Sequence, residues 1–415
     1  MAGAESLRVA LLSYRSKPTC GGQGVYLRHL SRELVGLGHS VEVFSGQPYP
    51  ELDEGVKLTK VPSLDLYRDE DPFRTPGLRE FRDWIDVLEV GTMWTAGFPE
   101  PLTFSLRAYR ELKKRVGDFD VVQDNQTLGY GLLGIQKLFP VVGTIHHPIS
   151  VDRRIELEAA EGIKKLTMRR WYGFVRMQSH VAPRLSPILT VSESSLADIH
   201  RDFNVPQANM RLIPLGVDTR YFHPRPHLPK RKGSIVAVAS ADSPMKGVAT
   251  LLRAVAKLAT ERDVNLTVVS KPTPGGPTEK LVGELSLHDR VRFVHGISDE
   301  ELGELIATSE ISVVPSLYEG FSLPAVEHMA CGTPLVASRT GALPEVVGDA
   351  AVQVAPGDAE ELAAVLRRLH DSPEEREAVG RRGYDRVMER FTWRVVAKRT
   401  AETYREAIER HKTRK

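Results

Sequence analysis

The stretch Ile311-Ser-Val-Val-Pro-Ser-Leu-Tyr-Glu-Gly-Phe-Ser-Leu-Pro-Ala-Val-Glu-His-Met-Ala-Cys-Gly332 predicts a strand, a glycine turn and a helix in direct succession. Its first five residues are a short apolar run typical of a buried strand. Ser322 is expected to cap the helix, with Pro324 in the first turn and Gly332 just after the end. A strand joined to a helix by so short a turn indicates an α/β fold.

The same turn has the features of a phosphate-binding site. Four backbone N–H groups would point out of the helix N-terminus, where unpaired donors and the helix dipole favour phosphate oxygens: those of Gly320, Phe321, Ser322 and Leu323. Glu319 before the turn and Glu327 within the helix can accept hydrogen bonds from hydroxyl groups on either side of that phosphate. The pattern therefore favours a ligand such as a sugar nucleotide, and the alternative is an ordinary turn with solvated glutamates.

Composition indicates a globular protein of two domains. The 415 residues exceed what one hydrophobic core usually supports. Lysine and arginine number 56 against 54 acidic residues, so no nucleic-acid partner is expected. The two cysteines, Cys20 and Cys331, lack metal-ligand spacing, which favours a reducing cytoplasm over a disulfide framework. The acidic N-terminus is not a secretory signal, and the apolar run 127–145 is broken by Lys137 and Pro140, so no membrane span is expected.

Strand-like runs alternate with helical patterns along both halves of the chain. In the first half these runs are Leu7–Leu12, Val41–Phe44, Asp120–Val122, Pro140–Ile145 and Ile188–Val191. In the second half they are Ser234–Ala239, Asn265–Val269, Arg292–Val294, Ile311–Val314 and Pro334–Ala337. The alternation predicts two Rossmann-like, doubly wound parallel sheets. The proline-rich, basic run 224–233 predicts the linker, which places the domains at 1–223 and 234–390.

The pair Glu319-x7-Glu327, with Gly320-Phe321 and Pro324 between, resembles the donor-site motif of glycosyltransferase family 4. Two further strings are in register with it, Ala330-Cys-Gly-Thr-Pro334 and Gly341-Ala-Leu-Pro-Glu345. The resemblance implies the GT-B fold, with two Rossmann-like domains facing each other across a cleft, and a mechanism that retains anomeric configuration. It also implies a C-terminal helix, 391–412, that packs back on the first domain.

The resemblance implies that the second domain binds a UDP- or GDP-linked hexose, with Glu319 at the sugar and Glu327 at the ribose. Lys246 precedes a glycine and a helix, a position suited to a cation that contacts the diphosphate, and the alternative is a solvated lysine. Ser240, also assigned to the donor site, stands where the family usually has arginine, so either Lys246 carries the charge alone or another cation substitutes. No metal or other cofactor is expected, because the acidic loop Asp69–Asp71 is interpreted as solvated.

Two features of the first half are expected to contribute to the same site. The loop Cys20-Gly-Gly-Gln-Gly24 lacks the third glycine of a dinucleotide-binding motif, so nicotinamide binding is not favoured. The resemblance implies that Gly21, Gly22 and Gly24 approach the donor diphosphate and the acceptor, and a purely conformational turn is the alternative. His146 follows a predicted strand at the edge where ligands bind, and it matches the family histidine near the transferred sugar. His147 is expected to point away.

These features predict a retaining hexosyltransferase with His146, Lys246 and Glu319 as catalytic residues. The sequence offers no obvious protein nucleophile, so front-face attack by a hydroxyl acceptor is expected, with the leaving phosphate taking the acceptor proton. Two alternatives stay open. One is a GT-B phosphorylase that uses inorganic phosphate, and the other is a sugar-nucleotide-binding protein without catalysis, which the serine at position 240 allows.

The acceptor, which the sequence does not specify further, is a lipid-linked, polyol or saccharide hydroxyl. Between residues 152 and 187 basic side chains alternate with apolar ones, namely Lys164, Lys165, Arg169, Arg170 and Arg176. This pattern predicts either a peripheral contact with the inner face of the membrane or a helix with a buried aromatic face and a solvated basic one. Trp84, Trp94 and Phe98 lie in a segment that looks inserted into the first domain, where they shape the acceptor pocket or simply pack.

Overall fold

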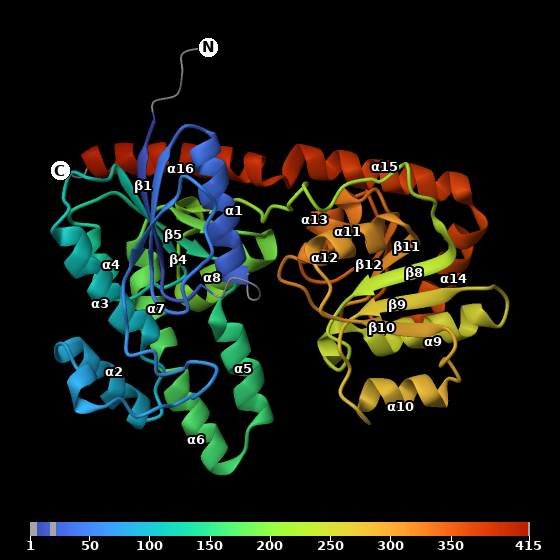
Figure 1. Ribbon diagram of the computed structural model, residues 1–415, viewed down its shortest axis with the longest axis horizontal. Coiled ribbons are helices and arrows are strands. Elements are labelled where there is room, and N and C mark those ends of the chain that lie inside the picture. The colour runs from blue at the N-terminus through green and yellow to red at the C-terminus, as the bar shows by residue number, and fades with distance from the viewer. Residues whose placement is uncertain (1–5, 17–21, 414–415) are drawn as a thin grey trace. The chain divides into compact units, whose positions relative to one another are not determined.

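The computed structural model describes residues 6–16 and 22–413 and contains two compact units (Figure 1). Unit 1 comprises Met1–Val191, Ser195–Ile213 and Val396–Lys415, and unit 2 comprises Ser192–Ser194 and Pro214–Val395. Each unit has its own parallel sheet and its own hydrophobic core. Together with the structural relatives reported below, this architecture confirms the prediction of a GT-B fold.

Unit 1 is built on a seven-stranded parallel sheet in the order β3-β2-β1-β4-β5-β6-β7. The strands are β1 Arg8–Ser13, β2 Ser40–Ser45, β3 Lys57–Lys60, β4 Val121–Asn125, β5 Val141–Ile145, β6 Ile188–Thr190 and β7 Met210–Leu212. Five of them lie on predicted apolar runs. The sequence did not predict β3 and β7, because both are short edge strands with mostly half-exposed side chains that lack an apolar run.

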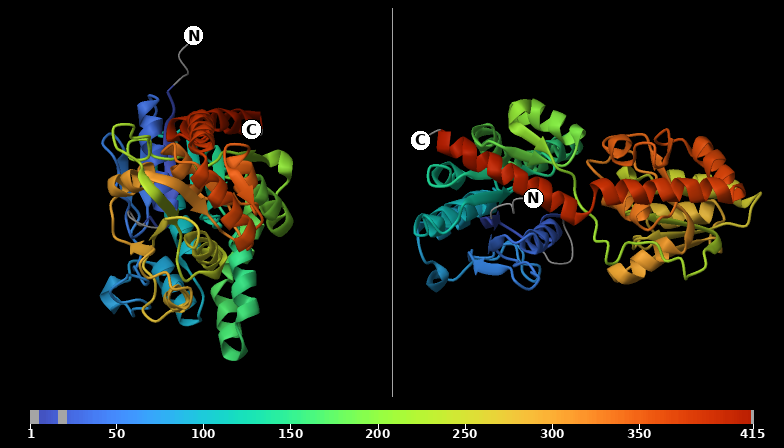
Figure 2. Two further views of the ribbon diagram at one scale, coloured as in Figure 1. Left: turned by 90° about the vertical axis from the view of Figure 1, so that its right-hand side faces the viewer. Right: turned by 90° about the horizontal axis from the view of Figure 1, so that it is seen from above.

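Helices cover both faces of this sheet, as the two views in Figure 2 show. The α-helices with residues in unit 1 are α1 Gly22–Gly36, α2 Trp84–Trp94, α3 Glu100–Lys113, α4 Gly131–Ile135, α5 Ile149–Ala159, α6 Gly162–Trp171, α7 Phe174–Val181, α8 Glu193–Phe203 and α16 Trp393–Thr413, and of these α2 and α6 extend away from the sheet (Figure 1). From Val396 onward α16 belongs to unit 1. Its Tyr404 is completely buried and its hydroxyl donates to the Gln123 side chain of β4, which fastens the end of the chain to the sheet.

Unit 2 has a six-stranded parallel sheet in the order β10-β9-β8-β11-β12-β13. Its strands are β8 Arg231–Val238, β9 Asn265–Val269, β10 Val291–Val294, β11 Ser309–Val314, β12 Leu335–Ser338 and β13 Val352–Val354. Its helices are α9 Val248–Ala259, α10 Pro277–Glu284, α11 Asp299–Ala307, α12 Leu323–Ala330, α13 Leu343–Val347, α14 Ala359–Asp371 and α15 Pro373–Arg390. Because the order reverses between β8 and β11, the loops after these two strands meet at a switch point, where ligands bind in such sheets.

The predicted linker, 224–233, differs from the structure at both ends. Unit 2 already begins at Pro214, because the Val217 N–H donates to the Phe391 carbonyl at 2.8 Å and Gly216 lies against the ring of Trp393. At the other end β8 starts at Arg231, so the last three residues of the predicted linker are strand. These residues form strand through backbone hydrogen bonds, for example from Arg231 N–H to the Thr308 carbonyl at 2.8 Å, although they lack the apolar pattern on which the prediction relied.

Other expectations about local structure can be compared directly. The apolar run 127–145 forms a short helix, α4, before Lys137, and the predicted strand, β5, directly after Pro140. Within the part of the chain that the structure describes, none of the helices is both long and apolar enough to span a bilayer. Asp69–Asp71 form an exposed loop, and Asp71 pairs with Arg68 at 3.1 Å.

Candidate functional site

The glycine turn between β11 and α12 has the predicted geometry. The Ser322 hydroxyl caps the helix by accepting a hydrogen bond from the Ala325 N–H at 3.4 Å, and Gly332 follows its end with a φ of 66°. Ser322 itself has a φ of 83°, a region that residues with a side chain rarely adopt, so the backbone of the turn is strained. Phe321 is buried and packs edge to face on Phe391 with 5.9 Å between ring centroids, and this contact holds the turn in place.

Two glycines let neighbouring loops approach the backbone on either side of Glu319. A Cβ atom on Gly247 would lie 1.9 Å from the Pro315 carbonyl oxygen, and one on Gly341 would lie 2.2 Å from the Glu319 carbonyl oxygen. Both glycines also have positive φ angles, 65° and 52°. The Ala342 N–H donates to the same Glu319 carbonyl at 2.9 Å. Only glycine fits at these two positions, and the result is a fixed backbone beneath the Glu319 side chain.

Glu319, Lys246 and Ser316 form a compact polar cluster. The Lys246 Nζ lies 2.8 Å from Glu319 Oε1, and the Ser316 hydroxyl donates to the same oxygen at 2.7 Å. The Glu319 side chain is 10% exposed and that of Lys246 is 36% exposed, so the carboxylate is buried while the ammonium reaches the surface. Among the described residues nothing hydrogen-bonds to Glu319 Oε2. The structure thus brings two of the three predicted catalytic residues together and adds Ser316, which the sequence did not single out.

Glu327 lies farther along α12 and has a different environment. Its side chain is partly buried, and within residues 6–16 and 22–413 it has no ion-pair partner. Burial, with a smaller contribution from the nearby negative charge of Asp299, raises the pKa of Glu327 to about 7. A carboxyl group that is partly protonated near neutral pH can both donate a hydrogen bond to a hydroxyl group and accept one from it.

This environment predicts a pH-dependent effect on stability. Since the pKa of Glu327 is raised, the folded protein binds a proton that the unfolded chain releases above about pH 4.5, and unfolding free energy is lost as pH rises through about 7. Glu327→Gln cannot titrate, so relative to wild type its unfolding free energy should be about 3 kcal/mol higher at pH 8 and less than about 1 kcal/mol higher at pH 5. Denaturant unfolding at both pH values measures this difference.

Other titrating groups cancel in the comparison because both proteins contain them. Glu284→Gln, a change at an exposed glutamate of α10, is the matched control and should show no pH-dependent gain. A stability difference for Glu327→Gln that is the same at both pH values would contradict the assigned environment.

The loop that ends at Lys246 begins at Ser240. Ser240 is exposed, and its carbonyl accepts the Ser243 N–H at 3.2 Å, while the Ser243 carbonyl accepts the Lys246 N–H at 3.0 Å. The Asp242 carboxylate in the same loop accepts the Thr273 N–H at 2.6 Å, and such bonds lower the pKa of Asp242 to about 2. Hydrogen bonds within the loop and to Thr273 therefore hold its backbone, and Lys246 is the cation at its end.

In unit 1, His146 follows β5 and is held by Asn125, the last residue of β4, and by Gln126, which comes next. The His146 Nε2 lies 2.7 Å from Asn125 Oδ1, and its backbone N–H donates to Gln126 Oε1 at 2.8 Å. Since Asn125 Oδ1 can only accept, Nε2 carries the proton. Burial lowers the pKa of His146 to about 4, so the ring is neutral at pH 7. A role for His146 in hydrogen bonding or shape fits this state better than a role as a general acid.

Asn125 also links this histidine to the glycine loop. Its Nδ2 donates to the Gln23 carbonyl at 3.2 Å, and Gln23 lies between Gly22 and Gly24 in the first turn of α1. Gly21, the other predicted glycine, lies outside the described residues. His147 has a separate partner, with its Nε2 3.2 Å from Asp152 Oδ1. The sequence analysis missed Asn125 and Gln126, although polar residues at the carboxyl end of β4 are a signal that could have found them.

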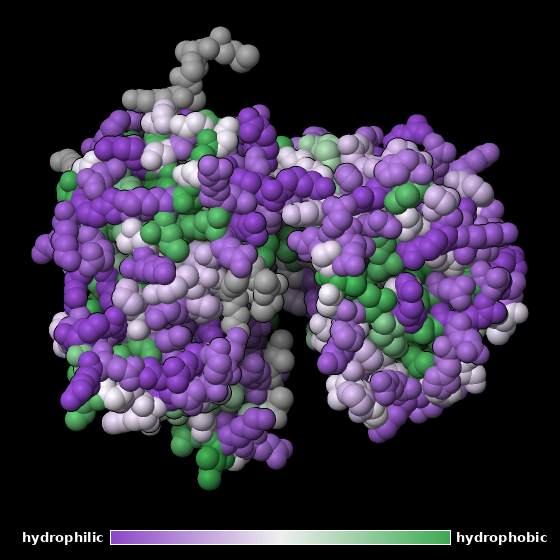
Figure 3. Space-filling model, in the orientation of Figure 1, coloured by the Kyte–Doolittle hydropathy of each residue, from purple (hydrophilic) through white to green (hydrophobic). Residues whose placement is uncertain are grey.

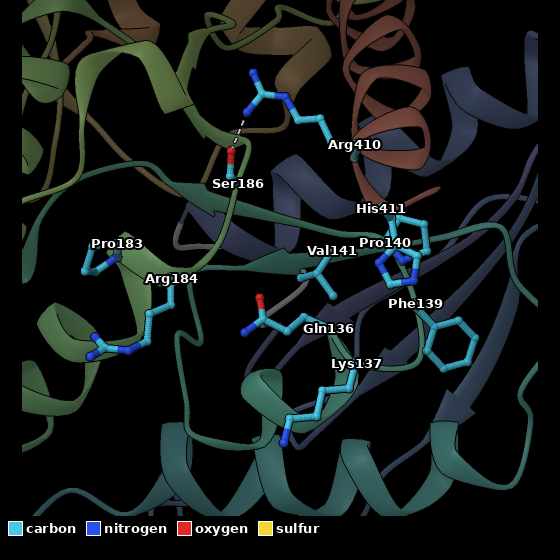
Figure 4. A pocket seen from close by; sticks show the side chains of 11 residues that line it. Gln136, Lys137, Phe139, Pro140, Val141, Pro183, Arg184, Ser186, Arg410 and His411 are labelled. Atoms are coloured by element: carbon cyan, nitrogen blue, oxygen red, sulfur yellow. Dashed lines mark hydrogen bonds between the residues drawn. The ribbon is translucent and has the colours of Figure 1, made fainter. Parts of the chain in front are cut away.

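One cavity of unit 1 lies away from these residues. It has a volume of about 620 Å³ and its walls include Lys137, Pro140, Val141, Arg184 and Arg410 (Figure 4). Val141 is the first residue of β5, whereas His146 follows the last, so this cavity lies at the opposite edge of the sheet. None of the predicted site residues contributes to it. The volume of this cavity therefore does not mark it as the candidate functional site.

Comparison with known proteins identifies the class. Residues 20–221 match the family described as Glycosyltransferase Family 4, and residues 220–386 match Glycosyl transferases group 1. Two Rossmann-like units with this turn and these matches define a glycosyltransferase of the GT-B class, a hexosyltransferase. The chain belongs to glycosyltransferase family 4.

Named relatives include an MMP α-(1→4)-mannosyltransferase of Mycolicibacterium hassiacum, 58% identical over 409 residues that cover 97% of this chain and 99% of the relative. A D-inositol 3-phosphate glycosyltransferase of Thermobispora bispora is 28% identical, with 98% and 96% covered. Among solved structures, sucrose-phosphate synthase from Thermosynechococcus elongatus superposes with a TM-score of 0.69 at 24% identity, covering 96% of this chain and 98% of that one. Anabaena Alr3699/HepE in complex with UDP superposes with a TM-score of 0.70 at 16% identity, covering 96% of this chain and 100% of that one. These structural likenesses support the fold.

Proposed function

We propose that the protein is a retaining α-mannosyltransferase that transfers mannose from a nucleoside diphosphate mannose to the 4-hydroxyl of a saccharide acceptor. The cluster of Lys246, Glu319 and Ser316 beside the strained turn carries the proposal, because it joins a cation, a carboxylate and backbone N–H groups at one edge of the sheet. The name of the relative that is 58% identical supports the sugar and the linkage. The UDP complex of a structural neighbour supports a nucleotide-linked donor, and either UDP or GDP is compatible with the residues described.

In this proposal the diphosphate lies at the glycine turn. The N–H groups of residues 320–323 and the Lys246 ammonium balance its charge. A doubly charged diphosphate competes with Glu319 for Lys246, and Ser316 keeps the Glu319 carboxylate in place when the ammonium turns to the phosphate. Glu319 Oε2 then accepts a hydroxyl of the sugar, and Glu327 binds the ribose.

The reaction proposed is a front-face displacement. The bond between the sugar C1 and the diphosphate oxygen breaks, the bond from the acceptor oxygen to C1 forms on the same face, and the acceptor proton passes to the leaving phosphate oxygen. The protein positions both substrates and stabilises the negative charge that develops on the diphosphate, contributions that reach several kcal/mol in such sites. Neutral His146 is assigned a hydrogen-bonding role. With two cysteines in 415 residues, the cytoplasm is the proposed compartment.

Two properties of the reaction follow and can be measured together. The product should keep the α configuration of the donor, as seen by NMR of the anomeric proton. Activity should also survive EDTA, since Lys246 and the backbone N–H groups, rather than a metal ion, are proposed to balance the diphosphate charge. An inverted anomer, or activity that is lost in EDTA and restored by Mn²⁺ or Mg²⁺, would remove this mechanism.

A donor screen tests the function itself. Thermal unfolding with UDP-glucose, UDP-galactose, GDP-mannose and ADP-glucose should show the largest upward shift with the mannose donor, because a bound ligand stabilises the folded state by mass action. Turnover of that donor with a mannoside acceptor, and not with inorganic phosphate alone, separates the transferase from a phosphorylase. Binding of the donor without turnover of any acceptor would favour a binding protein.

A further inference from the structure

Exposed hydrophobic side chains are concentrated at one end of unit 1. Of the eleven large hydrophobic side chains that are exposed among the described residues, seven lie in residues 73–94 and 163–166. Ile163 is 85% exposed, Leu166 68% and Trp94 68%, and Trp84 and Val87 are also exposed. Figure 3 shows hydrophobic residues in green at the lowest point of this unit, where Figure 1 places α6. Single exposed apolar residues are normal, but such a concentration indicates a contact surface.

The helices α2 and α6 form one body at this end. Arg170 near the end of α6 donates from Nε to the Thr95 carbonyl at 3.0 Å and from Nη2 to the Thr95 hydroxyl at 2.9 Å. Trp171 packs edge to face on Tyr67 with 5.6 Å between ring centroids and lies 5.1 Å from Phe98. The helix pair α5–α6 and helix α2 extend from the same end of unit 1 in Figure 1 and in the left view of Figure 2. The C-terminal ends of α2 and α6 are therefore linked, and both helices carry exposed hydrophobic side chains at this end of unit 1.

No residue of α6 is fully buried, although Met168 and Trp171 pack in part on the core of unit 1, and the helix carries a strong positive charge. Its ten residues include Lys164, Lys165, Arg169 and Arg170 and no acidic residue. The acidic side chains of α2 are neutralised, since Asp83 pairs with Arg110 at 2.6 Å, Asp86 pairs with Arg107 at 2.6 Å, and Glu89 also pairs with Arg107. Two exposed glutamates lie nearby, Glu158 in α5 and Glu161 at the N-cap of α6, so two acidic groups stand against the four basic residues of the helix.

We propose that this surface, defined by Trp84, Val87, Trp94, Ile163, Leu166, Lys164, Lys165 and Arg169 and called the α2–α6 surface, binds peripherally to an anionic lipid bilayer. Exposed apolar side chains beside lysine and arginine on one helix are features of a helix that lies in the headgroup region. A short helix gains little stability by itself in water, so a helix that buries only parts of Met168 and Trp171 is expected to have its exposed apolar side chains covered in its working state.

Two other occupants fit the α2–α6 surface less well. A symmetric contact with a second copy through this surface would bring two positively charged patches together, where like charges repel. A small-molecule ligand would need a concave site, whereas α6 projects from the unit and none of its residues is fully buried. Negative headgroups match both the charge and the projecting shape.

The test uses vesicles that contain phosphatidylglycerol and the full-length protein at low salt. We expect binding that weakens strongly at 1 M NaCl, because screening shortens the range of surface electrostatics. Lys164→Ser/Lys165→Ser/Arg169→Ser should lower the partition coefficient by about 100-fold. The matched control Lys113→Ser/Lys137→Ser/Arg184→Ser removes the same charge at exposed positions elsewhere on unit 1, and it should change binding by less than about threefold.

Tryptophan fluorescence reports insertion independently of charge. Brominated acyl chains should quench the emission of Trp84 and Trp94, and Ile163→Ser/Leu166→Ser should reduce both quenching and binding. No binding at low salt, equal loss in the two triple variants, or a dimer that the serine substitutions dissociate would overturn the proposal. Turnover of a soluble acceptor without vesicles should be unchanged in all these variants, so the outcome is independent of the proposed function.

Discussion

Replacing Lys246 by alanine is expected to lower kcat/KM by more than about 100-fold, because losing one charge-stabilising donor usually costs about 2.7–4 kcal/mol of transition-state stabilisation. The structure adds a second reason. The ammonium lies 2.8 Å from Glu319 Oε1, and without it the buried carboxylate would repel the donor diphosphate. Initial rates with the best donor at several concentrations give kcat/KM for wild type and variant.

Lys232→Ala is the control for this experiment, because Lys232 is exposed near the start of β8 whereas Lys246 follows the end of the same strand. It should leave kcat/KM within about twofold, as surface substitutions away from a site usually have small effects. Adding Ser240→Arg to Lys246→Ala should restore part of the activity if an arginine at this position reaches the diphosphate. A loss of less than about threefold in Lys246→Ala would mean that another cation carries that charge.

Glu319→Gln is expected to reduce kcat by about 10- to 100-fold, since hydrogen bonds to charged groups contribute about 1.5–3 kcal/mol. Glutamine keeps the shape and one acceptor for Lys246 and Ser316 but removes the negative charge next to the sugar. Glu327→Gln is the comparison. It should mainly raise the donor KM, because the ribose is bound equally in the ground and transition states. Wild-type kinetics in both variants would contradict the assigned donor site.

The strands that could be predicted from the sequence are those with an apolar run. Val141–Ile145 is buried along its whole length because helices cover both sides of its parallel sheet, and Asn265–Val269 buries Leu266 and Val268. The strands β3 and β13 could not be predicted in this way, because they are edge strands of four and three residues whose mostly half-exposed side chains have no apolar pattern. The start of β8 was missed for a related reason, since Arg231–Gly233 pair through their backbone while their side chains resemble those of a linker.

The candidate site divides in the same way. The turn, its cap and its two glutamates follow from local sequence, because capping and glycine geometry act over a few residues. The ion pair between Lys246 and Glu319 spans 73 positions and depends on the meeting of two loops at the switch point of the sheet. The hydrogen bonds of Asn125 to His146 and to the Gln23 carbonyl likewise need β4, β5 and α1 side by side. Patterns over a few neighbouring residues cannot predict contacts between residues so far apart in the sequence.

The last helix has a consequence for how the protein is made. Val396, Ala397, Thr400 and Tyr404 of α16 are completely buried, and from Val396 onward the helix belongs to unit 1, whose other residues are synthesised first. Domains generally fold in the order in which they leave the ribosome. Here residues 214–395 emerge, and unit 2 can be completed, while the apolar surface that α16 covers on unit 1 is still open. The half of the protein that is translated first is therefore the half that finishes folding last.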